Sequence, residues 1–214
     1  MKEPYIRRLF RPQLENPILI CGLPGLGEVS RIVAHLLIKF TQAELFAELY
    51  SPSFPDYVLI DDEGVCRPPR YEFYASKTGG KDFIILTGDV QPLMEDVLAH
   101  YEVCGRVLDF AADYGCRFII TVGGAPGPQV EREIYVAATS QKMAQGFVEK
   151  GAIIYAGGRI VGASGLLLGL AKERGLDGVC LLGSTPGLTA DRESGSHVYR
   201  FLMKILGTDI KERL

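Results

Sequence analysis

The chain has 214 residues, of which 47% are apolar and 23% are charged, and its formal net charge is −3. This composition predicts one compact domain over residues 1–214 that can bury a substantial core. The weak negative charge, with no basic cluster longer than Arg7-Arg8, excludes nucleic-acid binding that depends on neutralising phosphates. No segment has the roughly 18 uninterrupted apolar residues of a membrane span, and the start carries no apolar signal core, so we expect a cytoplasmic protein without a membrane partner.

The first part of the chain combines one strand-turn-helix unit with several strand-like segments. A strand at 18–21 leads into a glycine-rich turn, and apolar residues at helical spacing then predict a helix over 28–40. Strand-like segments follow at 43–50, 57–60, 71–76 and 83–86. Residues 78–81 predict a hairpin turn between the last two, so antiparallel pairing is expected here. The prolines within 67–70 lack the backbone donor that a ladder needs, which predicts a loop or an edge.

The second part of the chain alternates helices and strands. Residues 92–114 are predicted to be helical, in two pieces that meet near Gly105, with Gly115 as the C-cap. The apolar residues expected to face the sheet from these helices are Leu93, Val97, Leu98, Tyr101, Val107, Leu108 and Ala111. Further strands are predicted at 117–122, 134–138, 152–155 and 179–182, and further helices at 141–150, 164–174 and 193–206. This pattern predicts a three-layer α/β protein whose mixed sheet is mostly parallel, with an antiparallel hairpin portion.

Three of the predicted strands end in a Pro-Gly turn. These turns are Gly22-Leu23-Pro24-Gly25, Gly124-Ala125-Pro126-Gly127 and Ser184-Thr185-Pro186-Gly187. Ligand crevices in open α/β sheets lie beyond the carboxyl ends of the strands, so we expect these turns to share one edge of the sheet. The candidate residues for an interface or a ligand site at this edge are Gly22, Pro24, Gly25, Gly27, Asp89, Gly123, Gly124, Pro126, Gly127, Ser164, Gly165, Gly183, Pro186 and Gly187.

The first glycine loop differs from the known nucleotide-binding loops. Its spacing is G-x-x-G-x-G rather than G-x-G-x-x-G, and no Gly-Lys-Ser/Thr follows to hold phosphates and magnesium. Backbone amides at the helix start could receive an anion, but Glu28 competes for the positive end of the helix. Pro24 and Gly25 match the central positions of a type II turn, so turn formation or subunit packing is favoured over anion binding.

The candidate catalytic residues lack partners in the sequence. Ser164 resembles a nucleophile elbow but is followed by Leu166 in place of glycine, so an N-cap of the next helix is favoured. The three histidines, His35, His100 and His197, show no metal-ligand spacing and fall in predicted helices. Asp89 lies at the glycine-loop edge, and a helix-capping role before Pro92 explains it without chemistry. We therefore expect no catalytic residue.

The remaining chemistry-bearing residues favour structural roles. Asp61-Asp62-Glu63 precede Gly64 in a predicted solvated turn, and Glu131-Arg132-Glu133 favour a solvated face over a charged rim for a partner. No C-x-x-C pair or ligand spacing is present, so structural thiols are predicted, and neither a metal nor a cofactor is expected. The thiols belong to Cys21, Cys66, Cys104, Cys116 and Cys180.

A set of short motifs resembles one protein family when the motifs are taken in order. The chain is similar, over about residues 17–206, to the proteasome assembly chaperone 2 family in its archaeal form. The segments that carry this resemblance are Gly22-Leu23-Pro24-Gly25-Leu26-Gly27, Phe54-Pro55, Gly88-Asp89-Val90-Gln91-Pro92, Thr121-Val122-Gly123-Gly124, the long run from Gly158 to Ala171, and Leu182-Gly183-Ser184-Thr185-Pro186-Gly187.

The resemblance implies a phosphorylase/hydrolase-like α/β fold and a homo-oligomer, trimeric or tetrameric. It also implies kinship with chaperones that help to assemble the proteasome α-ring, and it brings no catalytic residues. Relatives that engage the proteasome can carry a carboxyl-terminal hydrophobic-Tyr-any tail that inserts between α-subunits. The last residues here, Glu212-Arg213-Leu214, depart from that pattern, and Tyr199 lies too far from the end and in a predicted helix.

Three functional hypotheses follow. The first is a non-enzymatic, homo-oligomeric chaperone or adaptor related to proteasome α-ring assembly, with α-subunits as its partners. The second is a small-molecule or nucleotide-binding protein, or a hydrolase, that uses the glycine-rich loops at the carboxyl edge of the sheet; fold analogy alone supports it. In the third, oligomerisation itself uses the loops, because Gly165 and Gly169 lie four residues apart and allow close backbone approach between subunits.

Overall fold

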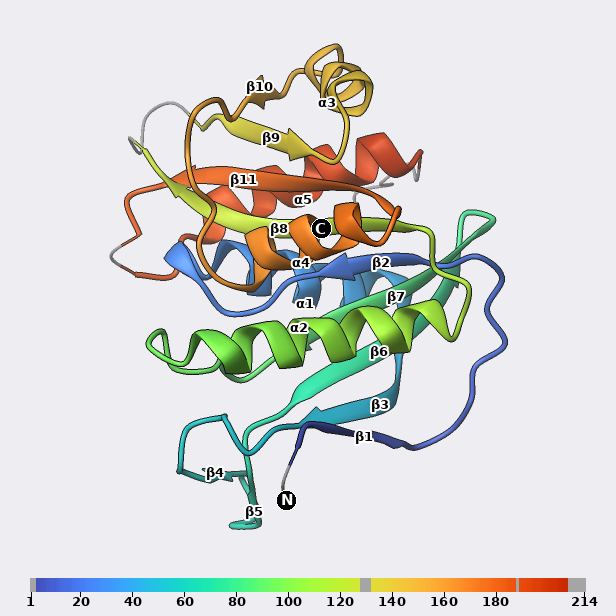
Figure 1. The fold of residues 1–214 in the computed structure, drawn as a ribbon, viewed down its shortest axis with the longest axis vertical. Helices are drawn as coiled ribbons and strands as arrows, with labels where there is room; N and C mark the ends of the chain where they lie inside the picture. Colours follow the sequence, from blue (N-terminus) through green and yellow to red (C-terminus); the bar gives the residue numbers. More distant parts are fainter. Residues whose placement is uncertain (1–2, 128–131, 188, 208–214) are drawn as a thin grey trace.

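The computed structural model describes residues 3–127, 132–187 and 189–207. Within these residues, nine strands form one sheet (Figure 1). In spatial order the strands are β1 (Tyr5–Arg8), β3 (Glu44–Tyr50), β6 (Tyr71–Thr78), β7 (Lys81–Gly88), β2 (Ile18–Cys21), β8 (Phe118–Pro126), β11 (Asp177–Thr185), β9 (Ile134–Ala138) and β10 (Ile153–Ile154). A separate two-stranded ribbon consists of β4 (Leu59–Ile60) and β5 (Cys66–Arg67).

The sheet has a parallel centre and an antiparallel flank. Strands β7, β2, β8 and β11 run parallel to one another, so their carboxyl ends meet at one edge. The β6–β7 hairpin turns at Thr78 and Lys81, as predicted, and β3 and β1 extend the antiparallel side. On the other side β9 is antiparallel to β11. The predicted α/β class with a mixed sheet is confirmed, and its antiparallel portion is larger than a single hairpin.

Helices cover both faces of the sheet (Figure 1). One face carries α2 (Val97–Ala112) and α4 (Ala163–Glu173), and the opposite face carries α1 (Val29–Thr41) and α5 (Arg192–Leu206). Helix α3 (Gln141–Val148) lies beside β9 and β10, and a short 3-10 turn, η1 (Leu26–Glu28), leads into α1. No helix among the described residues is long and apolar enough to cross a membrane.

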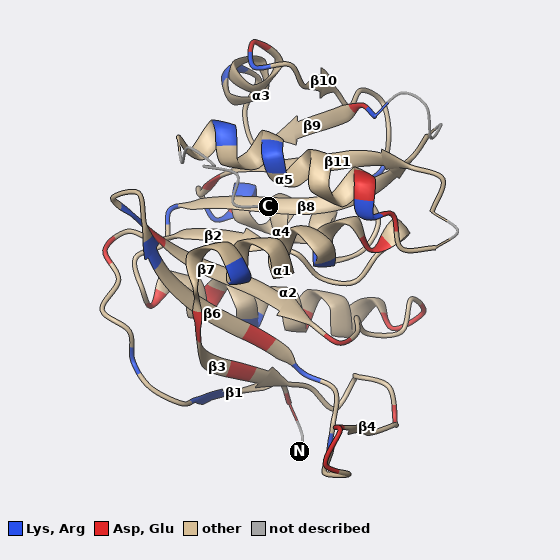
Figure 2. Ribbon diagram, turned by 180° about the vertical axis from the view of Figure 1, so that it is seen from behind, with Lys and Arg blue, Asp and Glu red and all other residues tan. Residues whose placement is uncertain are grey.

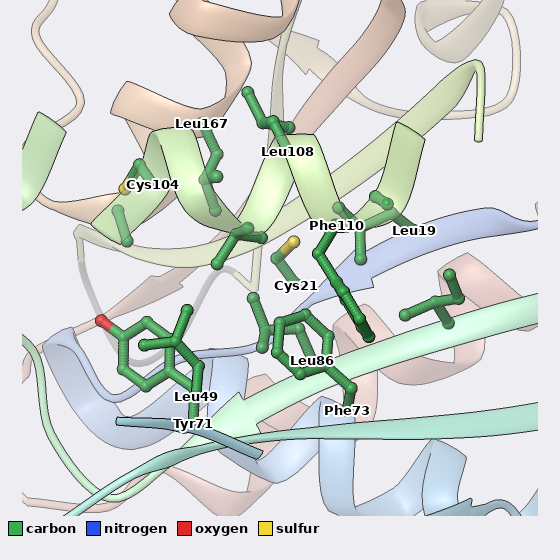
Figure 3. Packing of buried hydrophobic residues seen from close by; sticks show 14 of the residues in the cluster. Leu19, Cys21, Leu49, Tyr71, Phe73, Leu86, Cys104, Leu108, Phe110 and Leu167 are labelled. Atoms are coloured by element: carbon green, nitrogen blue, oxygen red, sulfur yellow. The ribbon is translucent and has the colours of Figure 1, made fainter. Parts of the chain in front are cut away.

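The continuous apolar runs of the central strands follow from this double cover. In β7, Ile84 and Leu86 face the α2 and α4 side, whereas Phe83 and Ile85 face the α1 and α5 side. Figure 3 shows the hydrophobic cluster on the α2 and α4 side of the sheet, in which Phe73, Phe110 and their neighbours fill the space between α2 and the sheet. A strand that is buried on both faces has no polar alternation, which is why these strands could be located from the sequence.

Helix α2 differs from its prediction in two ways. It is one continuous helix that passes through Gly105 and begins only at Val97, where the side chain of Asp96 accepts a hydrogen bond from the Ala99 amide. The prediction that its first apolar residues face the sheet is wrong, because Leu98 is 69% exposed. The other apolar residues that the prediction placed against the sheet and that are exposed in the structure are Leu93, Val97 and Tyr101.

Two of the three Pro-Gly segments differ from the turns that the sequence predicted. Strand β8 continues through Pro126, because it pairs with β11 as far as Thr185. Pairing with a long neighbouring strand therefore outweighs the turn preference of Pro126. Strand β11, in contrast, ends at Thr185, and Gly187 follows Pro186 with φ 74°, as expected of a Pro-Gly turn. In the first loop Gly25 has φ −174°, an extended conformation that excludes a type II turn, and the left-handed residues are Gly27 and Glu28 instead.

Candidate functional site at the carboxyl edge of the sheet

A groove of about 1030 Å³ opens at the carboxyl edge of the parallel strands, between α2 and α4. Its floor comes from the loop after β2 and the ends of β8 and β11, and its walls come from the first turns of α2, the segment before α4 and one face of α4. The residues that line the groove include Pro24, Gly25, Gln91, Met94, Val97, Tyr101, Gly123, Gly124, Arg159, Val161, Ser164, Gly165 and Gly169.

The structure brings about half of the predicted candidate residues together in this groove. Those that line it are Pro24, Gly25, Gly123, Gly124, Pro126, Ser164 and Gly165. The others, which lie outside the lining, are Gly22, Gly27, Asp89, Gly127, Gly183, Pro186 and Gly187. The predicted edge therefore contains a groove with a glycine-rich floor, together with positions that serve packing behind it.

Glycine is required behind the floor because two backbone segments nearly touch. A Cβ atom at Gly22 would collide with the carbonyl oxygen of Ser30 and lie 2.6 Å from the Cβ of Ala34. A Cβ at Gly124 would collide with the carbonyl oxygen of Leu26. The Gly22 contact lets the end of β2 pack directly on α1, and the Gly124 contact lets the loop after β2 pack directly on β8. Packing within the chain therefore explains both glycines.

The two glycines of α4 have different surroundings. A Cβ at Gly165 would collide with the carbonyl oxygen of Ile160 in the same chain, whereas a Cβ at Gly169 would meet no atom within 4 Å. Close packing within the subunit therefore accounts for Gly165. Only Gly169 presents an open surface, and it does so inside the groove.

The serine hydroxyls at the groove are already engaged with the backbone. Ser164 Oγ donates a hydrogen bond to the Val122 carbonyl at 2.8 Å, and Ser30 Oγ donates to the Leu23 carbonyl at 2.5 Å. The N-cap of α4 is Gly162, so the prediction that Ser164 caps this helix is wrong. Ser164 lies one residue inside the helix and fastens it to β8, which no local sequence signal distinguishes from capping.

The side chain of Gln91 links three segments of the chain, a role that the motif containing it did not indicate. Its side-chain Nε2 donates to the Pro24 carbonyl at 2.5 Å, and its Oε1 accepts from the Ala163 amide at 2.9 Å. One side chain thus joins the loop after β2, the segment before α2 and the start of α4. It also occupies the first amide of α4, which an anion would otherwise use.

Asp89 is part of an ion pair and caps no helix. Its carboxylate accepts two hydrogen bonds from the Arg67 guanidinium, at 2.6 and 2.9 Å, and one from the Arg70 amide at 2.9 Å. Burial opposes ionisation, but these hydrogen bonds outweigh it and lower the pKa of the Asp89 carboxyl group. The predicted capping role is wrong; Asp96 caps α2, and Asp89 holds the β4–β5 ribbon against the sheet edge.

The charged segment before β9 is also paired within the chain. Arg132 donates to Asp191 at 2.9 Å and also pairs with Glu193 at the start of α5. Glu133 accepts a hydrogen bond from the Tyr135 hydroxyl. Glu131 and the terminal Glu212-Arg213-Leu214 lie outside the described residues.

The titratable groups near the core give no sign of a reactive centre. Burial raises the pKa of the Cys104 and Cys180 thiols to about 12, which keeps them protonated at neutral pH. Cys66, on the ribbon, is the exposed cysteine, while the other four are buried. Within the described part of the chain, no group of three or more His, Cys, Asp or Glu side chains is arranged to hold a metal ion.

The fold and the groove define an α/β protein with a large apolar groove whose serine hydroxyls and linking glutamine are bonded within the chain. The PAC2 family model matches residues 19–213, so the chain belongs to the PAC2 family. This confirms the family that the sequence motifs indicated.

Relatives and solved structures agree with this assignment. Pyrococcus furiosus PbaB, an archaeal proteasome activator, is 39% identical, with a TM-score of 0.93 over 99% of this chain and 92% of that one. Pyrococcus furiosus PbaA, an archaeal homolog of proteasome-assembly chaperone, is 27% identical, with a TM-score of 0.82 over 98% and 84% of the two chains. An uncharacterized protein of Methanocaldococcus jannaschii is 34% identical over 200 residues, which are 92% of this chain and 76% of that protein.

Proposed function

We propose that this protein is a non-enzymatic chaperone or adaptor that acts on the proteasome through its α-subunits and works as a homo-oligomer, trimeric or tetrameric. The observation that carries the proposal is the similarity to PbaB, which spans 99% of this chain at 39% identity with the fold intact. The function predicted from the sequence agrees with the roles that PbaB and PbaA have.

The chemistry of the groove supports binding over catalysis. A hydrolase needs a nucleophile within reach of a base, and both serines at the groove donate to backbone carbonyls. A phosphate site needs free amides at a helix start, and Gln91 occupies the first amide of α4. The alternative function as a small-molecule binder or hydrolase is therefore not favoured.

The proposal is tested by mixing the recombinant chain with proteasome α-subunits of its own organism and weighing the complexes by native mass spectrometry. We expect a complex that contains both proteins and a changed rate of α-ring assembly or of proteasome peptidase activity. Absence of any complex, in both this experiment and a pull-down from native cytosol, would overturn the proposal.

A thermal-shift screen with nucleotides, nucleosides and phosphate tests the alternative. A ligand at 100 times its dissociation constant adds about 2.7 kcal/mol to the free energy of unfolding, which is a clear shift of the melting temperature. We expect no shift with any of these compounds.

A further inference from the structure

An unusual connection joins the neighbouring antiparallel strands β3 and β6. Such strands are ordinarily joined by loops of two to five residues, whereas here the 20 residues 51–70 intervene. They project the β4–β5 ribbon away from the sheet (Figure 1). Connections of this length between neighbouring strands are uncommon in a compact domain, and this one carries its own two-stranded ribbon.

The base of the ribbon is fixed and its outer part has no cover. At the base, the ring of Phe54 packs 4.9 Å from that of Tyr71, and Arg67 pairs with Asp89. Every residue from 60 to 66 is exposed, and Ile60 is 60% exposed. The other exposed apolar side chains of the ribbon are Tyr57, Val58 and Val65. A small apolar cluster held on a rigid base is typical of an interaction surface.

The ribbon and the groove lie at the same edge of the sheet. Residue Tyr71 at the start of β6 pairs with Gly88 at the carboxyl end of β7, so the 51–70 connection leaves from the edge at which the groove opens. Residues 51–70 contribute nothing to the groove lining, so the ribbon does not fill the groove of its own chain. In both ribbon views α2 lies between β4 and α4 along the long axis (Figures 1 and 2).

The charges of the two surfaces are complementary. The ribbon turn carries exposed Asp61, Asp62 and Glu63, and Figure 2 shows acidic residues in the loops around β4. The groove carries Arg159, which is exposed and forms no ion pair among the described residues. The one carboxylate in the groove lining, Glu173, ends α4 and lies about 15 Å along the helix from its start, away from Arg159.

We propose that the groove of one copy receives the β4–β5 ribbon of a second copy. The ribbon projects from the same edge of the sheet at which the groove opens. A two-fold axis that passes in front of this edge would therefore place the ribbon of each copy against the groove of the other copy. The exposed apolar side chains of the ribbon would then lie against Met94, Val97 and Val161, and the acidic turn would lie at Arg159. This inference rests on the self-association in the proposed function and selects its tetrameric form, because a two-fold contact closes on two copies and a tetramer can be built from two such pairs.

Site-directed cross-linking of the full chain tests the contact. Cys66 on the ribbon is the natural exposed thiol, and Val161→Cys adds a second thiol at the groove. Treatment with a short bismaleimide is expected to give covalent dimers of Val161→Cys and none once Cys66→Ser is added. The matched control is Ile154→Cys, which replaces an exposed apolar residue outside the groove lining and is expected to stay uncross-linked.

The second measurement is the oligomeric state as a function of concentration, by analytical ultracentrifugation. Replacement of both Ile60→Asp and Val65→Asp is expected to raise the dissociation constant at least about tenfold while the melting curve of the isolated subunit is retained. The inference would be overturned if the wild-type chain were monomeric at all concentrations. It would also be overturned if the dissociation constant were unchanged by these substitutions and no cross-link formed. Binding to proteasome α-subunits is measured separately. If the chain binds α-subunits but gives no cross-link, this inference alone is refuted. If the cross-link forms but the chain does not bind α-subunits, only the proposed function is refuted.

Discussion

The two ends of α2 lie in opposite surroundings although both carry apolar residues at helical spacing. Toward its carboxyl end, Val107, Leu108 and Phe110 are buried between α2 and the sheet (Figure 3). At its start, Val97 and Leu98 are exposed, and Val97 lines the groove. The first region stabilises the fold, and we expect the second to add little to the stability of a single subunit.

An apolar stripe on a helix can therefore continue past the core onto the surface of the molecule. Large contiguous apolar patches on a monomer mark interaction sites, whereas single exposed apolar residues are normal. Substitutions in the packed region should therefore change the free energy of unfolding, and substitutions at the exposed end should change association. Stability and association can therefore be measured as two separate properties of α2.

The sharpest comparison removes the same side chain at the two ends of α2. Leu108→Ala takes atoms from a fully buried site and leaves a cavity, so we expect a loss of about 2–5 kcal/mol in the free energy of unfolding. Leu98→Ala is expected to stay within about 0.5 kcal/mol of wild type. Urea unfolding of both variants measures the difference. Equal losses would show that the start of α2 belongs to the core.

A single added methyl group tests the backbone contact behind the groove floor. In Gly22→Ala the new Cβ collides with the Ser30 carbonyl and Ala34, so we expect a loss of about 1–3 kcal/mol in the free energy of unfolding. Urea midpoints compared at equal m-values give the number. An unchanged midpoint would mean that the loop after β2 can move away from α1 without a loss of stability. The interpretation that Gly22 is required for close packing would then be wrong.

Much of the fold followed from local patterns, and most of the groove did not. The doubly covered strands were found because Ile84, Ile85 and their neighbours form uninterrupted apolar runs, and the β6–β7 turn was found from its glycines. The exposure of Leu98 depends on where the sheet ends in space, which helical periodicity does not encode. The groove walls likewise depend on long-range contacts such as Gln91 to Pro24 and Ala163. The separate β4–β5 ribbon was not predicted either: residues 57–60 were expected to form a strand, whereas β4 holds only Leu59–Ile60 and pairs with β5 outside the main sheet.

Asp89→Asn tests the link between the packed region and the ribbon. The asparagine keeps the shape but loses the charge that pairs with the Arg67 guanidinium and accepts a hydrogen bond from the Arg70 amide, so we expect a loss of about 1–2 kcal/mol at pH 7. Because the folded pKa of Asp89 is lowered, its contribution is complete above the unfolded value of about 4 and disappears as pH falls through the folded value. The difference between wild type and variant should therefore shrink below about pH 4 in urea titrations. A difference that is constant from pH 7 to pH 3 would show that geometry, and not charge, holds the ribbon base.

The smallest expected effect is a gain in stability, and it comes from the same change that is costly at Gly22. Gly146 lies within α3, and a Cβ there would meet no atom within 4 Å. Gly146→Ala therefore reduces the conformational entropy of the unfolded chain without a collision, and we expect a gain of about 0.5–1 kcal/mol in the free energy of unfolding. Thermal and urea melts of Gly146→Ala beside Gly22→Ala compare one methyl group in open and in closed surroundings. A loss at Gly146 would place a neighbouring subunit against α3 and move the assembly surface away from the ribbon and the groove.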